Sequence, residues 1–194
     1  MKFEDFAKNY LNDINKLVSS VPVKDLEKAI DIIKKTYIKN KKIILMGNGG
    51  SASTASHITC DLSKCTIRPG KPRLKVFCIV DNVPLITAWA NDTSYENIFY
   101  EQLMNILDKG DLVIAFSGSG NSLNVLKAIE YANKAGAMTI GISGFNGGKL
   151  ATIAQHNLIV NSTNMQHIED LHLIMAQIIF SFLRDEVIIP NDKR

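Results

Sequence analysis

The sequence predicts an α/β fold in which five parallel strands form one doubly wound, flavodoxin-like sheet. Runs of strand character recur along the chain, and segments with helical spacing of apolar residues separate them. The first run opens the segment KIILMGNGGS (42–51). The other four are LKVFCIV (74–80), DLVIAF (111–116), AMTIGIS (137–143) and HNLIVN (156–161). Strands that alternate with helices in this way form a parallel sheet with helices on both faces.

Long amphipathic helices are expected at both ends of the chain. Residues 3–19 and 24–38 place apolar side chains three and four positions apart. A last helix from about Met165 to Leu183 is too apolar for a solvated face, yet too short and interrupted to span a membrane. This apolar surface predicts self-association, and packing across the chain's own sheet is the alternative.

Composition indicates one globular domain and does not point to a nucleic-acid partner. The 194 residues are 46% hydrophobic and 21% charged, which is enough apolar content for one sizeable core. A net charge of +3 is too small to predict nucleic-acid binding. Three cysteines lie in or beside apolar segments, which predicts reduced thiols. The N-terminus has no apolar signal region, so we expect a cytoplasmic protein.

The first strand run breaks into a glycine-rich loop, Gly47 to Ser51, before a helix. Such a loop lets backbone N–H groups approach an anion, and the following helix adds the positive end of its dipole. The loop lacks the lysine of a GxxxxGK[ST] nucleotide site and does not complete a GxGxxG dinucleotide site. It is therefore either an anion cradle or a plain strand-to-helix turn with Ser51 as the N-cap.

A second loop of this kind follows the third strand run and favours the cradle. Its sequence is SGSGNS (117–122), with three hydroxyls and two glycines before a helical segment. Loops at the carboxyl ends of parallel strands converge on one crevice, so the two loops are expected to share a ligand. Serines without a lysine suit a monophosphate. A third loop, with Gly144, Gly147 and Gly148, is either a plain turn or a further ligand contact.

Two helices carry candidates for chemistry. His57 and Asp61 are four residues apart, so they share a helix face. Glu169, His172 and Gln177 on the last helix are spaced so that all three could face one cleft. A nitrogen with several oxygens suits a divalent metal such as Zn²⁺, or an acid/base pair that acts on a sugar carbon. Each histidine could instead be a structural residue with hydrogen-bond partners.

Together these motifs resemble the sugar isomerase (SIS) family. They are GNGGS, a histidine six positions after its serine, SGSGNS before a helix, AND (90–92), the GGK loop and IEDLH on the last helix. Within that family the chain is similar to phosphoheptose isomerases, which interconvert sedoheptulose 7-phosphate and D-glycero-D-manno-heptose 7-phosphate. The resemblance implies a single SIS domain over 1–194, with N-terminal helices in 1–40, the sheet in 41–161 and a C-terminal helix and tail in 162–194.

The resemblance also implies site residues and an assembly. Its substrate contacts fall on Asn48, Gly49, Gly50, Ser51, Asn91, Asp92, Ser117, Gly118, Ser119, Ser122 and Glu169. Its metal site, where one is present, falls on His57, Asp61, Glu169 and Gln177. It further implies a homotetramer with sites at subunit interfaces and the terminal helices in a central bundle.

Four of these positions depart from the family's usual pattern. Members commonly have Thr at Gly118 and Gln at Glu169, with Glu as general base at Asp61 and His as general acid at Gln177. Asp61 can still shuttle a proton between adjacent carbons, whereas Gln177 cannot give one up. His172 is then a candidate substitute acid, and a bound metal could act as Lewis acid.

Two functions therefore stay open from the sequence. The first is a phosphosugar isomerase that works through an enediol, with Asp61 as its base. The second is a catalytically silent tetramer that binds a phosphosugar or a protein partner in a regulatory role.

Overall fold

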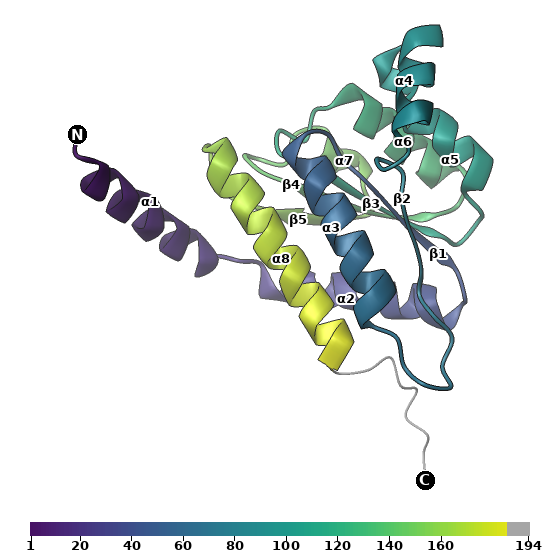
Figure 1. The fold of residues 1–194 in the computed structure, drawn as a ribbon, viewed down its shortest axis with the longest axis horizontal. Helices are drawn as coiled ribbons and strands as arrows, with labels where there is room; N and C mark the ends of the chain where they lie inside the picture. Colours follow the sequence, from purple (N-terminus) through teal and green to yellow (C-terminus); the bar gives the residue numbers. More distant parts are fainter. Residues whose placement is uncertain (186–194) are drawn as a thin grey trace.

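A computed structural model describes residues 1–185 of the chain, and it contains one sheet of five parallel strands in the order β2-β1-β3-β4-β5 (Figure 1). The strands are β1 (Lys42–Met46), β2 (Lys75–Cys78), β3 (Leu112–Ser117), β4 (Met138–Ser143) and β5 (His156–Ile159). The helices are α1 (Phe3–Val18), α2 (Val23–Ile38), α3 (Gly50–Cys65), α4 (Val83–Asp92), the short 3-10 helix η1 (Tyr95–Asn97), α5 (Tyr100–Ile106), α6 (Leu123–Lys134), α7 (Leu150–Ile153) and α8 (Met165–Asp185). The predicted flavodoxin-like sheet is confirmed.

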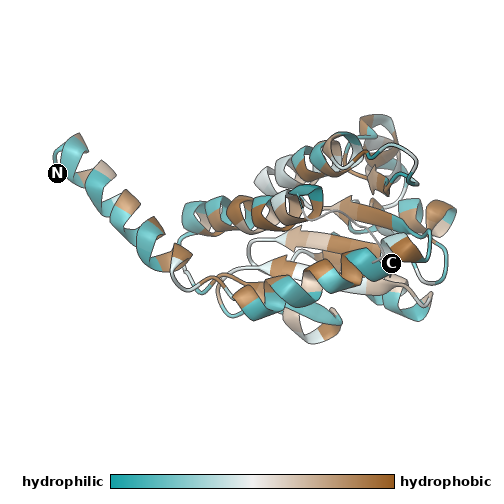
Figure 2. Cartoon of the chain, turned by 90° about the horizontal axis from the view of Figure 1, so that it is seen from below, coloured by the Kyte–Doolittle hydropathy of each residue, from teal (hydrophilic) through white to brown (hydrophobic). Residues whose placement is uncertain are grey.

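Alternating side chains along each strand separate two hydrophobic cores. In β1, Ile43 and Leu45 pack with α2, α3 and α8 on one face of the sheet. Ile44 and Met46 pack with α5, α6 and α7 on the other. Figure 2 shows the hydrophobic strands enclosed between these helices. A strand that is buried on both faces reads as a continuous apolar run, which is why the strands are visible in the sequence.

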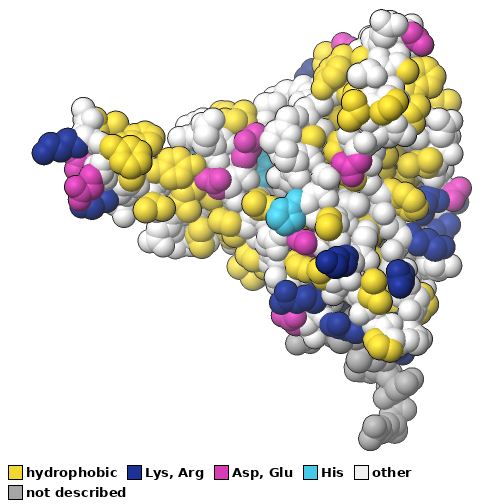
Figure 3. Space-filling view, in the orientation of Figure 1, with side chains coloured by type: hydrophobic (Ala, Val, Ile, Leu, Met, Phe, Trp, Pro, Cys, Tyr) yellow, Lys and Arg dark blue, Asp and Glu magenta, His cyan; other side chains and the backbone are white. Residues whose placement is uncertain are grey.

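Helix α1 extends away from the sheet (Figures 1 and 2) and has no buried residue of its own. Its contact with α8 includes a 2.5 Å hydrogen bond from the Tyr10 hydroxyl to Asp170. This bond raises the pKa of Tyr10 to about 12, because Asp170 accepts a hydrogen bond from the neutral phenol and its charge disfavours the phenolate. The Tyr10 ring also packs edge-on against His167, with the ring centroids 4.5 Å apart. Hydrophobic side chains remain in view along α1 (Figure 3).

The predicted element boundaries agree with the structure to within a few residues. The separate helices α4, η1, α5 and α7 are additions, since the sequence indicated only helical spacing between the strands. The predicted tail after α8 falls on 186–194, outside the described residues. Within 1–185, the helices are all too short or too polar to cross a bilayer.

Candidate functional site

The first glycine loop places the start of α3 directly beyond the carboxyl end of β1. Gly49 occupies the N-cap position with φ 55°, and α3 begins at Gly50. The alternative in which Ser51 caps the helix is wrong, because Ser51 lies inside the first turn and is buried. The N-cap thus has no side chain, and the nearest anion at the N-terminus of this 16-residue helix is the Glu169 carboxylate from α8.

The second loop gathers its hydroxyls at the carboxyl end of β3. Ser117 Oγ lies 3.3 Å from Ser122 Oγ, and Ser119 Oγ accepts a hydrogen bond from the Asn121 N–H at 3.1 Å. Ser122 is the N-cap of α6, but its hydroxyl makes no capping hydrogen bond. Since Ser117 donates its one O–H to Ser122, the hydroxyls of Ser119 and Ser122 retain the capacity to donate to a phosphate oxygen.

Side-chain hydrogen bonds join the two loops. The carboxamides of Asn48 and Asn124 pair reciprocally, with both N···O distances at 2.9 Å. The Tyr95 hydroxyl donates to Asn48 Oδ1 at 3.0 Å. We define Asn48–Ser51 and Ser117–Ser122 together as the cradle. Sequence reasoning missed Asn124 and Tyr95, and the only local signal was a polar residue at a buried position in the first turn of α6.

The third glycine loop supports the second loop from behind. Gly144 N–H donates to the Gly118 carbonyl at 2.9 Å, and Leu150 N–H donates to the Gly120 carbonyl at 2.9 Å. Gly120 has φ 65°, and a Cβ built on it would lie 2.1 Å from the Gly147 carbonyl oxygen. Only glycine meets both conditions at position 120. The third loop is thus a turn that supports the second loop, and its contact with a ligand stays a prediction.

A second cluster joins α3 to α8. His57 Nε2 lies 3.2 Å from Asp61 Oδ2, with the two side chains 52% and 20% exposed. Gln177 Nε2 lies 2.8 Å from Asp61 Oδ2 and 3.1 Å from His57 Nε2. We call His57, Asp61 and Gln177 the α3–α8 cluster. It is open to solvent, and the amide orients the carboxylate by donating to one of its oxygens.

The other two candidates on α8 lie elsewhere. The Glu169 carboxylate approaches Gly50 so closely that a Cβ there would lie 2.7 Å from both oxygens, which places Glu169 at the start of α3. His172 is only 1% exposed, and neither ring nitrogen has a hydrogen-bond partner in the described part of the chain. Burial lowers the pKa of His172 to about 4, so the imidazole is neutral at pH 7. His172 is thus placed as a core residue.

Asn91 and Asp92 end helix α4, where both are exposed. Asn91 Nδ2 donates to Asp92 Oδ1 at 2.8 Å, and in residues 1–185 neither side chain bonds to the cradle. The contact from this segment comes from Tyr95 instead. At Gly118, Met165 fills the space of a side chain, because a Cβ would lie 2.5 Å from its Sδ.

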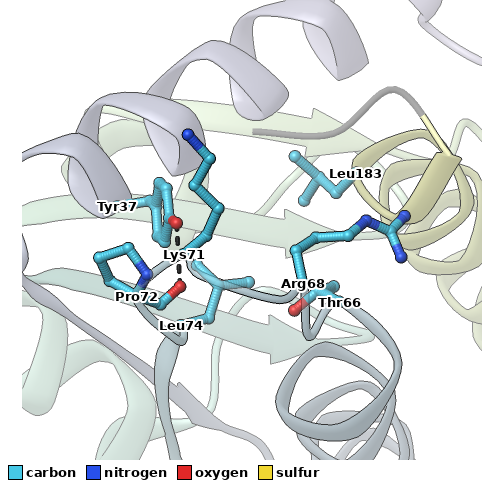
Figure 4. Close-up of a pocket in the computed structure, with 7 residues that line it drawn as sticks. All are labelled: Tyr37, Thr66, Arg68, Lys71, Pro72, Leu74 and Leu183. Carbon is cyan, nitrogen blue, oxygen red and sulfur yellow. Dashed lines mark hydrogen bonds between the residues drawn. The ribbon is translucent and has the colours of Figure 1, made fainter. Parts of the chain in front are cut away.

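A small pocket lies at the far end of α3, away from the cradle (Figure 4). Its volume is about 10 Å³, room for about one water molecule, so it is too small for a sugar phosphate. Figure 4 shows the Tyr37 hydroxyl donating to the Pro72 carbonyl at 2.9 Å. Arg68 also donates to the Arg184 carbonyl. These contacts attach the loop after α3 to α2 and α8.

The donor set for a metal is partial. In the described residues, no three His, Cys, Asp or Glu side chains lie close enough to hold one ion. Glu169 therefore does not complete a three-ligand set with His57 and Asp61. The α3–α8 cluster offers an imidazole nitrogen, a carboxylate oxygen and the Gln177 carboxamide, which suits a borderline divalent cation.

Comparison with known proteins assigns the family. A model of the SIS domain matches residues 9–144. The phosphoheptose isomerase of Aliarcobacter butzleri is 36% identical over 164 residues, 84% of this chain and 85% of that protein. The chain belongs to the SIS-domain phosphoheptose isomerase family. The Helicobacter hepaticus phosphoheptose isomerase is 34% identical over 91% of this chain and 89% of its own length.

The fold agrees with a solved member of the family. The structure of phosphoheptose isomerase GmhA from Neisseria gonorrhoeae superposes with a TM-score of 0.88 at 22% identity. The match covers 96% of this chain and 100% of that one. The resemblance stated from the motifs is thereby confirmed for the family and the fold.

Proposed function

We propose that this protein interconverts sedoheptulose 7-phosphate and D-glycero-D-manno-heptose 7-phosphate. The observation that carries the proposal is the α3–α8 cluster. In it the Gln177 amide orients the partly exposed carboxylate of Asp61 on α3. The same helix begins at the cradle, so one element presents both an anion site and a candidate base. The names of relatives that are 34–36% identical support this substrate pair.

The cradle would hold the phosphate. Ser119 and Ser122 supply hydroxyl donors, and the N-terminus of α3 supplies a favourable field that the phosphate would share with the Glu169 carboxylate.

In the reaction, Asp61 would remove a proton from one carbon and return it to the adjacent one. The Gln177 amide holds the carboxylate at 2.8 Å, which fixes the base before substrate binds. The second hydrogen of the Gln177 amide faces His57 Nε2 at 3.1 Å, so a hydrogen bond to the enediolate oxygen would have to replace that contact. Gln177 cannot transfer a proton, so proton transfer at that oxygen falls to another donor.

We further propose that a divalent metal, with zinc as the candidate, binds at His57, Asp61 and Gln177. Glu169, which the resemblance places among the metal ligands, lies instead beside Gly50 at the start of α3. When bound, it would supply a Lewis acid for the carbonyl oxygen. Equilibrium dialysis against Zn²⁺, followed by metal analysis, tests this without an activity assay. Wild type should retain zinc and His57→Ala should lose it, and equal retention by both would place the metal elsewhere.

A homotetramer in the cytoplasm completes the proposal. The described chain has an apolar groove of about 460 Å³ where α2 meets α8, lined by Val21, Leu26, Ile30, Ile174, Ile178 and Phe182, among others. Exposed Phe3, Phe6 and Leu11 on α1 add to this surface. A second copy of the chain would bury it. The free thiols Cys60, Cys65 and Cys78 support a reducing compartment. Sedimentation at micromolar concentration should give a tetramer, and a monomer would overturn the proposed assembly.

The decisive experiment follows sedoheptulose 7-phosphate by NMR in D₂O, with and without Zn²⁺. The isomerase should form the aldose and exchange the proton between C1 and C2. The silent binder is the second candidate, because the resemblance stated from the motifs implies a histidine as general acid where this chain has Gln177. Binding without either turnover or exchange, under any divalent metal, would establish that candidate instead.

A further inference from the structure

We propose that Asn124 and Tyr95 are positioning residues, which fix the Asn48 carboxamide so that it offers only an N–H to the bound ligand. The inference deepens the proposed function, on which it rests for the identity of the ligand. Chemistry fixes the direction of one hydrogen bond beside Asn48. The backbone N–H of Val125 donates to Asn124 Oδ1 at 2.9 Å, and a backbone N–H can only donate. The atom that it meets must therefore be the oxygen, and Asn124 Nδ2 must point the other way.

Asn124 then imposes an orientation on Asn48. Asn124 is 2% exposed, so its polar atoms need partners inside the protein. Its Nδ2 donates to Asn48 Oδ1 at 2.9 Å, while its Oδ1 accepts from Asn48 Nδ2 at 2.9 Å. A flipped Asn48 would bring two amide groups and two oxygens face to face. The orientation of a residue on the β1 loop is thus set from the first turn of α6, 76 positions along the chain.

Tyr95 completes the arrangement from a third segment. Its hydroxyl lies 3.0 Å from Asn48 Oδ1, which already accepts from Asn124. Since a carbonyl oxygen has two lone pairs, these two donors use its accepting capacity. One hydrogen on Asn48 Nδ2 is left over. Asn48 therefore presents a donor and no acceptor, as the oxygens of a phosphate or a polyol require.

Pre-orientation explains why this network lies at the cradle. A free asparagine would have to select one rotamer and one amide orientation at the moment of binding, which weakens affinity. Here the rotamer and the amide orientation of Asn48 are already fixed in the folded protein, so binding does not have to select them. The Tyr95 contact also joins the α4–η1 segment to the cradle, although Tyr95 itself is 56% exposed.

Tyr95→Phe tests the idea with little risk to the fold, because it removes one hydroxyl at an exposed position. Calorimetry with sedoheptulose 7-phosphate should show Kd raised about fivefold to tenfold, with kcat nearly unchanged. Tyr131→Phe is the matched control: Tyr131 packs on Tyr100, and its hydroxyl makes no hydrogen bond in residues 1–185. It should bind like wild type. A Kd within twofold of wild type for Tyr95→Phe would overturn the role of Tyr95.

A double-mutant cycle separates positioning from direct contact with the ligand. If Tyr95 acts only through Asn48, then Asn48→Ala with Tyr95→Phe should bind no more weakly than Asn48→Ala alone. Additive losses would mean that Tyr95 touches the ligand itself, and the positioning role would fall. Asn124→Leu, of similar size but without donors or acceptors, should raise Kd at least as much as Tyr95→Phe.

A ligand-free measurement keeps the inference separate from the proposed function. In ¹⁵N NMR spectra, the Asn48 side-chain NH₂ signals of wild type should resist exchange with water. They should lose that protection in Asn124→Leu and shift in Tyr95→Phe, with the backbone spectrum otherwise retained. Unchanged Asn48 signals in both variants would refute the inference. If wild type fails to bind sedoheptulose 7-phosphate, the proposed function falls and these spectra decide the positioning role alone.

Discussion

Gln177 on α8 donates a 2.8 Å hydrogen bond to Asp61 Oδ2 on α3, across 116 residues of sequence. The same amide nitrogen lies 3.1 Å from His57 Nε2. A neutral side chain thus holds the carboxylate that we propose as the base, and Gln177 itself has no proton to give up.

Asp61→Asn should lower kcat for sedoheptulose 7-phosphate by at least about 100-fold, because the amide cannot accept the substrate's proton. Steady-state kinetics on purified protein will measure the loss. Glu130→Gln removes an exposed carboxylate from α6 and serves as the control, with an expected rate close to that of wild type. An Asp61→Asn variant with full activity would show that another residue is the base.

Gln177→His should preserve or raise the rate, since it puts a titratable donor at the position of the amide. An unperturbed imidazole has a pKa of about 6.5 and can give a proton at neutral pH. The variant's rate profile should then acquire a pH dependence near that value. Gln177→Leu, which keeps the size but removes the polar atoms, should lose activity. If the His and Leu variants are equally impaired, Gln177 has no role at the substrate oxygen.

Ser119→Asp should abolish binding of sedoheptulose 7-phosphate in calorimetry. The added carboxylate repels the phosphate and takes up the donors that would hold it. Ser119→Asn is the matched control, because it adds similar bulk without charge. We expect at least about a 100-fold difference in Kd between the two variants. Equal Kd values for the Asp and Asn variants would mean that the phosphate binds away from Ser119.

His172 should make the protein lose stability as the pH falls from about 6.5 to about 4. In the unfolded chain the imidazole has its ordinary pKa of 6.5, whereas burial lowers the folded-state pKa to about 4. Above pH 6.5 neither state is protonated and the full stability is present. Below it the unfolded chain gains a proton that the folded chain excludes, which costs about 3 kcal/mol by pH 4 at 1.36 kcal/mol per pKa unit.

Urea unfolding of wild type and His172→Gln between pH 7.5 and pH 4 measures this dependence. The variant starts less stable, because Gln fills the core less well, but its stability should fall less steeply over that range. Parallel curves for the two proteins would show that His172 is not the group that titrates.

Gly120→Ala should destabilise the protein by about 3 kcal/mol or more, because the new Cβ meets the Gly147 carbonyl oxygen at 2.1 Å and φ is 65°. Gly70→Ala separates the two causes. Gly70 has φ 71° with no atom within 4 Å of a built Cβ, so it should cost only about 1 kcal/mol. Thermal unfolding will compare them, and equal costs would mean that the third loop simply moves aside.

The sequence by itself determined the features that lie within a single strand, loop or helix. The five strands are evident because residues such as Ile43, Ile44 and Leu45 are buried on both sheet faces and leave an unbroken apolar run. The glycine loops are evident because close approach to backbone excludes a Cβ. The pairing of His57 with Asp61 follows from a spacing of four on one helix.

Only the tertiary structure decided which of the remaining polar residues meet. Helix α8 is apolar around much of its circumference, so its spacing alone does not say that His172 enters the core while Gln177 reaches α3. That rotation is fixed by packing against α3 and the sheet. The hydrogen bonds that join Asn48 to Tyr95 and Asn124 likewise depend on three segments that converge at one edge of the sheet. Local periodicity fixes which face of an element is apolar, but the contacts between elements depend on how those faces pack.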